Sequence, residues 1–405
     1  MSIVKDINLE QEGVRKIKWA QDFMPVLGYL SSQYIPAQPF AGKRIAMSIH
    51  LEAKTAVLAL ALKTLGAEVH ITGCNTLSTQ DDVAAGLASL GVNVFAIHGI
   101  DEETYKSHLK TVLSCRPDLI IDDGGDLLET WCELPRPYKR KPIGGCEETT
   151  TGVNRLRIRE SEGTLPFPMV NVNDAKCKHF YDNKYGTGQS VMEAIMHLTN
   201  TLIAGKVVVV AGYGYCGRGI AMRARGMGAT VIVTEIDPIK AIEAKLDGFS
   251  VMTMESAAVF GDYFVTATGE DNVIRKEHML RMRPNAFLAN AGHFDTEINL
   301  RDLASISYKI EARRDGITGY ERREGLGRLN LLASGKLVNL AGGDGHPAEI
   351  MDMSFSVQLL SLLYLLSNKN RLRDKIYEVP EEINEKVARA KLLSEGTRID
   401  TPPEE

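Results

Sequence analysis

The stretch VVVVAGYGYCGRG at residues 207–219 decides the fold class of this chain. Its run of valines predicts a buried parallel strand, and Gly212, Gly214 and Gly217 follow at the spacing of a dinucleotide-binding turn. Glycines there let the backbone turn sharply and let a pyrophosphate approach the first N–H groups of the next helix. Glu235 closes the following strand, where a carboxylate accepts from both ribose hydroxyls and repels a 2′-phosphate. The pattern predicts a Rossmann domain that binds NAD rather than NADP; the alternative is a glycine turn that only packs a helix on a sheet.

The composition is that of an ordinary soluble globular protein with about two to three domains. Charged residues make up 24% of the 405 positions, and the formal net charge of −5 gives no basic footprint for nucleic acid. The N-terminus is interrupted by charges, unlike a signal peptide, and the apolar runs at 56–62 and 359–366 are too short to span a bilayer. The six cysteines show neither a CxxC pair nor a zinc-like spacing. We expect a cytoplasmic protein with no metal, no nucleic-acid partner and no membrane partner.

Short apolar runs alternate with helical patterns along most of the chain. The first series of expected strands lies at 44–49, 68–73, 93–98, 119–123 and 168–172. A helix is expected over 187–204, and the second series of strands then follows at 206–212, 229–235, 263–269, 286–292 and 336–342. Strand–helix alternation of this kind predicts parallel, doubly wound sheets.

We therefore predict an α/β fold of two doubly wound Rossmann-like domains with a cleft between them. The expected parts are a substrate-binding and catalytic domain at 1–183, an NAD-binding domain at 184–345, helices at 346–370 that pack back on the first domain, and a C-terminal tail at 371–405. Polar side chains follow many of the strands, where ligands of open α/β sheets bind. These strand-end positions are His50, 122–126, 171–174, Asn290, His293, Asp295 and Asn339.

Two further polar groups suggest chemistry at this edge. Lys178 and Asp182 are four residues apart, so on a helix they share one face. A lysine held in a partly desolvated cleft can act as a base, although a solvated ion pair is the commoner outcome of this spacing. The run EETTTG at 147–152 combines two carboxylates with three hydroxyls. It suits the vicinal hydroxyls of a sugar, and it could equally be a helix cap or a turn.

Several long strings, in chain order, resemble S-adenosyl-L-homocysteine hydrolases. They are STQDD (78–82), DDGGD (122–126), EETTTG (147–152), NVND with the following Lys and Asp-Asn (171–183), GYGYCGRG (212–219), VTEIDP (233–238), NAGHFD (290–295), LVNLA (337–341) and GHP (345–347). The resemblance runs from about residue 40 to residue 366. It is strongest to the branch found in archaea and some thermophilic bacteria.

The resemblance implies a reversible hydrolysis within the S-adenosylmethionine cycle of one-carbon metabolism. Bound NAD oxidises the nucleoside 3′-hydroxyl, the C4′ proton leaves, homocysteine is eliminated from C5′, water adds and the ketone is reduced again. Lys178 and Asp182 would handle the 3′-hydroxyl proton, and Glu148 with Thr149 would hold the ribose. His50 and Asp123, with His293 close by, would serve proton transfer at C4′ and C5′.

The resemblance also assigns the binding residues. The residues implied around NAD are the three glycines with Thr149, Thr150, Thr151, Asn183, Glu235, Thr268, Asn290 and Asn339. Those implied around the substrate are Glu52, Lys54, Thr55, Ser78, His346 and Met351. The family is generally tetrameric, so a homo-oligomer is expected, although this C-terminus lacks the lysine- and tyrosine-bearing tail of many relatives.

The chain departs from adenine-specific relatives at the purine edge. Where those read HMT[VI][QE]T, this chain has His50-Leu51-Glu52-Ala53-Lys54-Thr55. An ionised Glu52 only accepts hydrogen bonds and Lys54 only donates them, which suits hypoxanthine better than adenine. Both S-inosyl- and S-adenosyl-L-homocysteine stay open as substrates, since Lys54 could also face solvent. Two other readings are a 2-hydroxyacid-type NAD-dependent dehydrogenase and a non-catalytic NAD- or nucleoside-binding protein.

Overall fold

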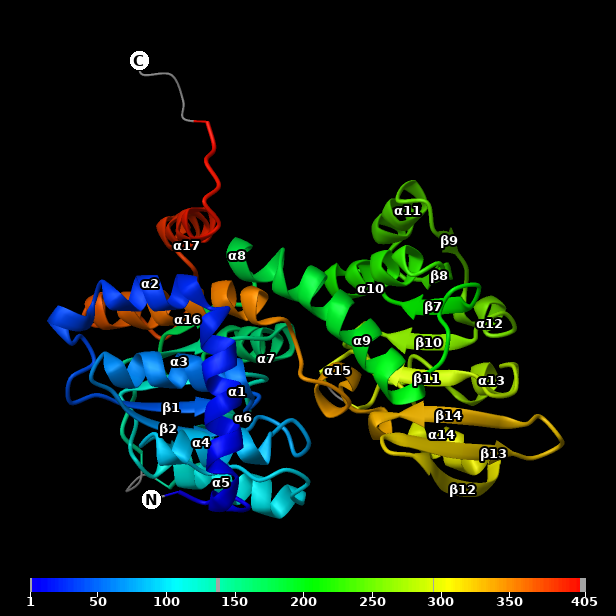
Figure 1. The fold of residues 1–405 in the computed structure, drawn as a ribbon, viewed down its shortest axis with the longest axis horizontal. Helices are drawn as coiled ribbons and strands as arrows, with labels where there is room; N and C mark the ends of the chain where they lie inside the picture. The colour runs from blue at the N-terminus through cyan, green and yellow to red at the C-terminus, as the bar shows by residue number, and fades with distance from the viewer. Residues whose placement is uncertain (1, 136–138, 294, 401–405) are drawn as a thin grey trace. The chain divides into compact units, whose positions relative to one another are not determined.

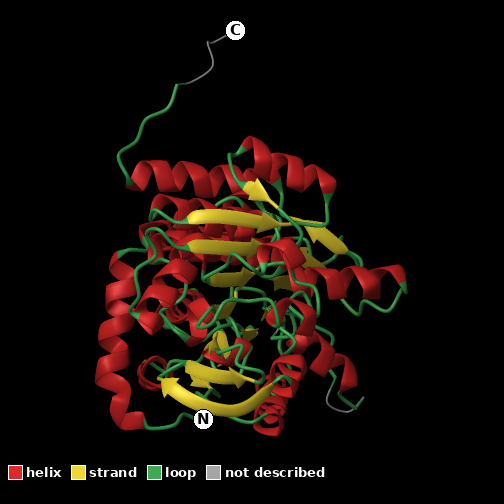
Figure 2. Ribbon diagram, turned by 90° about the vertical axis from the view of Figure 1, so that its right-hand side faces the viewer, coloured by secondary structure: helices red, strands yellow, loops and turns green. Residues whose placement is uncertain are grey.

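The computed structural model describes residues 2–135, 139–293 and 295–400. The chain divides into two compact units (Figure 1). The first is built from both ends of the chain, Met1–His179 and Ala348–Glu405, and the second is Phe180–Pro347. Apolar clusters on both faces of each sheet contain helix side chains, and the strands and helices are distinguished by colour in Figure 2.

The sheet of the first unit is parallel throughout and has the order β15-β6-β5-β4-β1-β2-β3. Its strands are β1 (Arg44–Ser48), β2 (Glu68–Thr72), β3 (Asn93–Val94), β4 (Leu119–Asp122), β5 (Gly144–Glu147), β6 (Met169–Asn171) and β15 (Ile376–Glu378). The first six follow the doubly wound order 3-2-1-4-5-6, so the winding reverses between β1 and β4. Ligands of open sheets bind where that reversal occurs.

Buried side chains on alternate strand positions pack against helices on opposite faces of this sheet. Ile45 and Met47 belong to one apolar cluster, and Ala46 between them belongs to the other. The helices of the first cluster are α1 (Glu10–Asp22), α2 (Pro25–Ser32), α3 (Ala53–Thr64), α4 (Asp81–Ser89), α8 (Lys176–His179), α16 (Ala348–Ser367) and α17 (Glu381–Ser394). Those of the second are α5 (Glu102–Leu113), α6 (Asp126–Glu133) and α7 (Thr150–Ser161). The C-terminal helices thus pack on the first unit, as predicted.

α16 is long and apolar enough to cross a membrane by length and composition, but 67% of its most apolar window is buried inside the structure. A helix that is apolar on all sides is typical of a protein core. Within the first unit, the carboxylate of Asp352 accepts from the N–H groups of Val26 (2.9 Å) and Leu27 (2.7 Å) at the start of α2. α16 is therefore a core helix of the first unit.

The second unit repeats the doubly wound order and extends it. Its sheet has the order β12-β13-β14-β11-β10-β7-β8-β9, parallel except for β12 and β13. The strands are β7 (Val207–Ala211), β8 (Thr230–Thr234), β9 (Ser250–Val251), β10 (Tyr263–Thr266), β11 (Phe287–Asn290), β12 (Ser307–Arg314), β13 (Ile317–Arg322) and β14 (Arg328–Leu332). From β9 to β14 the order is again 3-2-1-4-5-6, with the reversal between β7 and β10. The predicted α/β fold with two Rossmann-like sheets is confirmed.

The helices of the second unit lie on both faces of its sheet. One cluster contains side chains of α9 (Thr187–Thr199), α10 (Tyr215–Gly226), α11 (Pro238–Leu246) and α15 (Val338–Ala341). The other contains side chains of α12 (Met254–Ala257), α13 (Lys276–Met279) and α14 (Leu300–Ser305).

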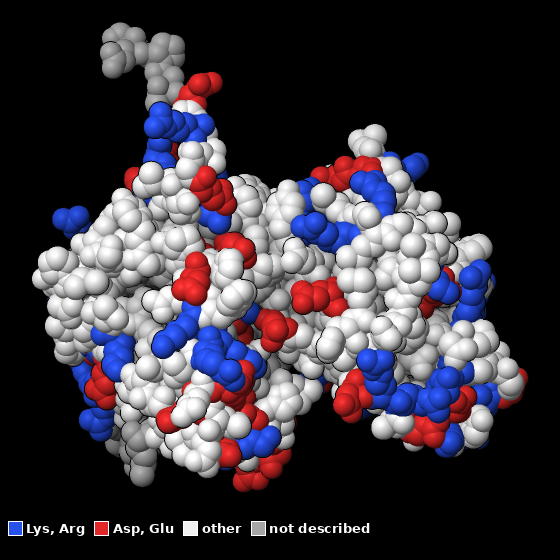
Figure 3. All heavy atoms as spheres, viewed as in Figure 1, with Lys and Arg blue, Asp and Glu red and all other residues white. Residues whose placement is uncertain are grey.

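Among the described residues drawn in Figure 3, basic and acidic side chains lie interspersed, so the surface on this face is of mixed sign.

The structure differs from the prediction at several elements. The expected strand at 336–342 is wrong, because β14 occupies the place beside β11 and the chain then turns through Ala333 and Ser334, both at positive φ, before α15 begins. A short apolar run does not distinguish a strand from a buried helix. The expected strand at 93–98 is only the two residues of β3. The stretch at 371–405, expected only as a tail, contains β15 and α17.

Candidate active site

The residues assigned from sequence are divided between the two units. The first unit contains His50, Glu52, Lys54, Thr55, Ser78, Asp123, Glu148, Thr149, Thr150, Thr151, Lys178 and Met351. The second contains Asp182, Asn183, Gly212, Gly214, Gly217, Glu235, Thr268, Asn290, His293, Asn339 and His346. Most of them follow the carboxyl end of a strand or begin the next helix.

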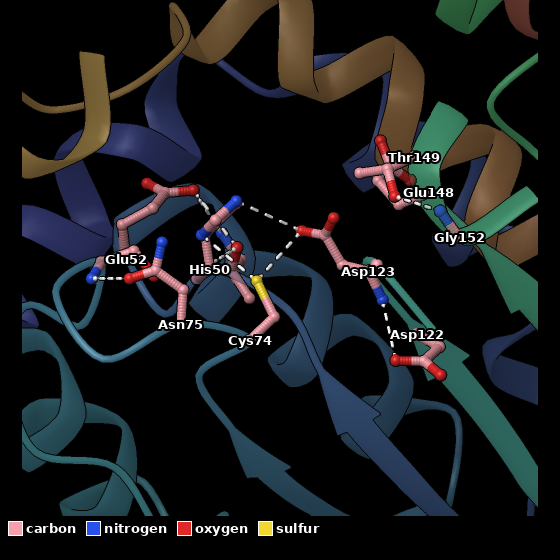
Figure 4. A network of polar contacts seen from close by, with 12 residues as sticks. His50, Glu52, Cys74, Asn75, Asp122, Asp123, Glu148, Thr149 and Gly152 are labelled. Atoms are coloured by element: carbon pink, nitrogen blue, oxygen red, sulfur yellow. Dashed lines mark hydrogen bonds and ion pairs between the residues drawn. The ribbon is translucent and has the colours of Figure 1, made fainter. Parts of the chain in front are cut away.

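His50, Cys74 and Asp123 form a polar cluster where the winding of the first sheet reverses (Figure 4). His50 follows β1, Cys74 follows β2 and Asp123 follows β4. His50 Nδ1 lies 3.2 Å from Cys74 Sγ, and the thiol donates to Asp123 Oδ2 at 3.4 Å. His50 Nε2 lies 3.6 Å from the same carboxylate oxygen. The sheet topology thus joins three groups that are far apart in sequence.

This cluster can move protons. Burial, and then the charge of Asp123, raise the pKa of the Cys74 thiol well above its usual value, so the thiol stays protonated. The His50 ring, 15% exposed, and the Asp123 carboxylate, 2% exposed, are the remaining members of the cluster and are side chains of the kind that act in general acid–base chemistry. The three ligand atoms lie within 4.8 Å of one another, close enough for one metal ion, but their mutual hydrogen bonds account for the arrangement without one.

Glu52 and Lys54 form a buried ion pair at the start of α3. Glu52 and Lys54 are 5% and 7% exposed, and Lys54 Nζ lies 2.6 Å from Glu52 Oε2. The Glu52 carboxylate also caps the helix, because it accepts from the N–H groups of Lys54 (2.9 Å) and Thr55 (3.2 Å). Lys54 therefore does not extend into solvent. The Thr55 hydroxyl donates to the His50 carbonyl at 2.6 Å, which ties this pair to the polar cluster.

Glu148 and Lys178 form a second buried pair in the same unit. Lys178 Nζ lies 3.6 Å from Glu148 Oε1, and the residues are 4% and 5% exposed. Gln358 of α16, with 0% exposure, donates from Nε2 to Glu148 Oε2. The oxygen of the Gln358 amide has no hydrogen-bond partner among the described residues. The returning C-terminal helix thus contributes a polar group to the site.

The spacing of Lys178 and Asp182 does not correspond to one regular helix. Lys178 lies in α8 (Lys176–His179), and Asp182 begins a π-helical turn, η4 (Asp182–Gly186). Within the second unit, His346 Nδ1 lies 3.0 Å from Asp182 Oδ1, and His346 Nε2 lies 3.3 Å from the Thr187 hydroxyl. His346, expected beside the base, therefore contacts the carboxylate expected to act on the ribose. π-helical turns are frequent at functional sites.

The turn after β7 has the backbone of a dinucleotide site. Gly212 has φ +95°, and a Cβ at Gly217 would lie only 2.0 Å from the Gly212 carbonyl oxygen. Gly214 caps the N-terminus of α10, and a Cβ there would meet nothing within 4 Å. Glu235, at the end of β8, accepts from the Tyr213 N–H at 2.6 Å, so its carboxylate lies against the turn. This arrangement leaves an open cradle at a helix N-terminus.

A second loop lies next to that turn, after β10. Glu297, which the sequence analysis missed, accepts from the N–H of Thr268 (3.0 Å) and of Gly269 (2.9 Å) and from the Thr268 hydroxyl (2.7 Å). Asn290 accepts from the N–H of Gly292 and donates to the carbonyl of Gly335. Thr268 and Asn290 are thus both held by hydrogen bonds that shape the loops.

These residues fit the NAD predicted from the sequence. A side chain at Gly214 would project into the open space at the start of α10, which glycine leaves free for a ligand. Asn339 donates to Ser190 Oγ at 3.1 Å, while its own Oδ1 is buried with no partner among the described residues. A buried amide oxygen of this kind is typical of a site that a ligand donor completes.

The sequence analysis missed several groups that contact the assigned residues, among them Cys74, Glu297 and Gln358. Cys74 carried a usable signal, since it follows a predicted strand like the other strand-end residues. Gln358 and Glu297 carried none, because one lies in an apolar helix and the other in a loop without a motif.

Two family models match the chain. Residues 1–136 match the model described as S-adenosyl-L-homocysteine hydrolase, and residues 183–345 match its NAD binding domain.

Curated relatives match over nearly their full length. The S-inosyl-L-homocysteine hydrolase of Methanocaldococcus jannaschii is 52% identical over 397 residues, which cover 98% of this chain and 95% of the relative. The adenosylhomocysteinase of Thermococcus kodakarensis is 53% identical over 402 residues, covering 99% and 95%. The adenosylhomocysteinase of Aquifex aeolicus is 50% identical over 403 residues, covering 99% and 96%.

Proposed function

The chain belongs to the S-adenosyl-L-homocysteine hydrolase family and is an NAD-dependent hydrolase of an S-nucleosyl-L-homocysteine, and from this premise we propose that its nucleoside is inosine. The dehydrogenase and the non-catalytic binding protein considered from sequence are not favoured by this membership. The relatives bear both substrate names at nearly equal identity, so the choice of base depends on this chain's own residues.

The observation that supports inosine is the buried Glu52–Lys54 pair. Hypoxanthine presents a carbonyl acceptor at C6 and an N–H donor at N1, whereas adenine presents an amino donor and an acceptor. A buried ammonium matches the carbonyl, and a buried carboxylate matches the N–H. Against adenine, Lys54 would face a donor and Glu52 would face an acceptor. Unmatched buried polar groups are costly, so such a site discriminates strongly.

We further propose the following catalytic roles, which the buried polar groups of each unit support. NAD supplies hydride transfer at the 3′-carbon when it is bound in the glycine cradle. Lys178, with Asp182, takes the proton of the 3′-oxygen, while Glu148 and Thr149 bind the ribose hydroxyls. His50 and Asp123 exchange protons with the substrate at C4′ and C5′ and with water. The protonated Cys74 thiol contacts both side chains and orients them.

Base preference is tested by condensing homocysteine with each nucleoside. We expect kcat/KM for inosine to exceed that for adenosine by at least about 100-fold, because only hypoxanthine pairs with both buried charges. The double substitution Glu52→Thr with Lys54→Gln should move the preference toward adenosine. Lys63→Gln, at the other end of α3, is the matched control and should keep the preference for inosine. Faster reaction of adenosine with the unmodified enzyme would contradict the proposal.

We also propose that the enzyme is a cytoplasmic homotetramer. The six cysteines are all free thiols, which suits a reducing compartment. Exposed apolar side chains on α11, at Ile239 (76%) and Leu246 (83%), suit burial between subunits. Light scattering should give four times the chain mass of 44.5 kDa. A monomer mass at micromolar concentration would exclude the tetramer.

A further inference from the structure

Two buried carboxyl groups lie next to the polar cluster and have no role in the chemistry described above. Asp122 ends β4 and Glu147 ends β5, and the two residues are register partners across the parallel strands. Partnered residues present their side chains on the same face of a sheet. Both residues have 0% exposure. The sheet therefore holds two acidic groups side by side, away from water.

Asp122 holds the turn that carries Asp123. Its Oδ1 accepts from the N–H groups of Asp123 (3.1 Å) and Leu127 (3.2 Å), and its Oδ2 accepts from the N–H of Leu128 (2.8 Å). The contact between Asp122 and Asp123 is drawn in Figure 4. These bonds fix the chain between the end of β4 and the first turn of α6, where Asp123 lies.

Glu147 links that turn to the next one. Its Oε1 accepts from the N–H of Gly124 (2.9 Å) and from the N–H (3.0 Å) and hydroxyl (2.9 Å) of Thr149. A Cβ at Gly152 would lie 2.0 Å from the Glu147 carboxyl carbon, so glycine is what makes room for the side chain. A single oxygen atom therefore connects the turn of Asp123 with the turn of Glu148 and Thr149.

The other carboxyl oxygen of Glu147, Oε2, is in an environment that favours the protonated acid. Glu147 Oε2 is buried and has no hydrogen-bond partner among the described residues. Lys178 Nζ contacts Glu148 and Arg155 Nη1 contacts Asp126, so each of these cations has a carboxylate partner other than Glu147. A proton on Glu147 Oε2 removes the like-charge repulsion between the two neighbouring carboxyl groups, so that the pair carries one negative charge instead of two.

The pKa values of Asp122 and Glu147 are both raised, as expected for two neighbouring buried carboxyl groups. Burial raises the pKa of Asp122 to about 7, against the opposing effect of its backbone hydrogen bonds. Burial, and then the charge of Asp122, raise the pKa of Glu147 well above its usual range. The other titratable or charged groups around the pair are Asp123, Asp126, Glu148, Cys74, Cys146, Tyr105 and Arg155. Burial also raises the pKa of both thiols and of the Tyr105 phenol, so these three stay protonated near neutral pH.

We propose that Asp122 and Glu147 share one proton and act together as positioning residues, which hold the turn of Asp123 against the turn of Glu148 and Thr149. Loss of the shared proton at alkaline pH leaves two adjacent buried charges and drives the two turns apart. The proposal rests on the proposed roles of Asp123 and Glu148, because it concerns how those groups are held.

The kinetic test compares the pH dependence of kcat in NAD-loaded wild-type enzyme and Glu147→Gln. The glutamine keeps an acceptor oxygen for the three donors and cannot ionise, so the alkaline fall in kcat should move up by at least about one pH unit. The acidic side of the profile should not change. Asp118→Asn is the matched control. Asp118 is also buried, at 5% exposure, and it accepts a hydrogen bond from the Arg44 N–H, but it precedes the amino-terminal end of β4, whereas Asp122 lies at the carboxyl end. Its alkaline limb should match that of wild type.

A spectroscopic test needs no turnover. The infrared difference spectrum of substrate-free holoenzyme between about pH 6 and about pH 9 should contain the carbonyl stretch of a protonated carboxylic acid. Glu147→Gln and Asp122→Asn should each remove or displace that band, and Asp118→Asn should retain it. An unchanged alkaline limb in Glu147→Gln overturns the proposal, and so does absence of the acid band in wild type. If the wild type cleaved no S-nucleosyl-homocysteine, the function would fail while the infrared result still decided the shared proton.

Discussion

Replacing Lys178 with alanine should lower kcat by about 10³-fold while nucleoside binding largely persists, as expected when a general base is removed. Lys178 is 4% exposed, and its Nζ lies 3.6 Å from the carboxylate of Glu148. Its removal takes away the group that accepts the 3′-hydroxyl proton, and it leaves the purine pair Glu52–Lys54 untouched. Single-turnover measurement of thiol release, with nucleoside Kd from equilibrium binding, separates the two effects.

The same short helix offers a matched control. Lys176 lies two residues earlier in α8, its side chain is 59% exposed, and it pairs with Glu381 on the surface. Lys176→Ala should leave kcat within about twofold of wild type, because exposed ion pairs contribute little. Equal losses in both variants, or undiminished turnover in Lys178→Ala, would remove Lys178 from the proposed chemistry.

Gly217→Ala should abolish NAD retention and, with it, nearly all turnover. The added Cβ would lie 2.0 Å from the Gly212 carbonyl oxygen, a backbone atom that cannot move without opening the turn. The helix N-terminus would then no longer present its N–H groups to the pyrophosphate. The bound dinucleotide can be quantified after the purified protein is denatured, independently of activity.

Gly226→Ala is the control for Gly217→Ala, because it adds a methyl group to the same helix at a position outside the dinucleotide turn. Gly226 ends α10, and a Cβ there meets nothing within 4 Å. Alanine at that position favours the helix by up to about 1 kcal/mol, so this variant should keep full NAD content and gain slightly in thermal stability. Full NAD content in Gly217→Ala would show that the close approach is not needed for binding.

The sequence predicted those parts of the fold whose signal is local. Strands such as β1, β7 and β8 are runs of buried apolar residues followed by a glycine or a polar residue, and the structure has them within a residue or two of the predicted bounds. β5 was missed because Gly144 and Gly145 leave it without the β-branched side chains of a typical strand. Its place is set by the strands on either side, which no local pattern records.

The candidate site was predictable to the same extent. Residues at strand ends, such as His50 and Asp123, were identified because the carboxyl ends of parallel strands lie on the same side of the sheet. The partners of those residues depend on contacts between distant segments. Gln358 reaches Glu148 across 210 positions of sequence, and Cys74 meets Asp123 across 49. Such pairings follow from tertiary packing and not from residue spacing.

The split composition of the first unit has a consequence for synthesis. Gln358 and the rest of α16 leave the ribosome after the whole of the second unit, yet they belong to the core of the first. Domains generally fold as units during translation. The central segment is therefore free to finish folding while the amino-terminal one still waits for its last helix. A nascent chain arrested before that helix would hold the cofactor cradle but not a complete nucleoside pocket.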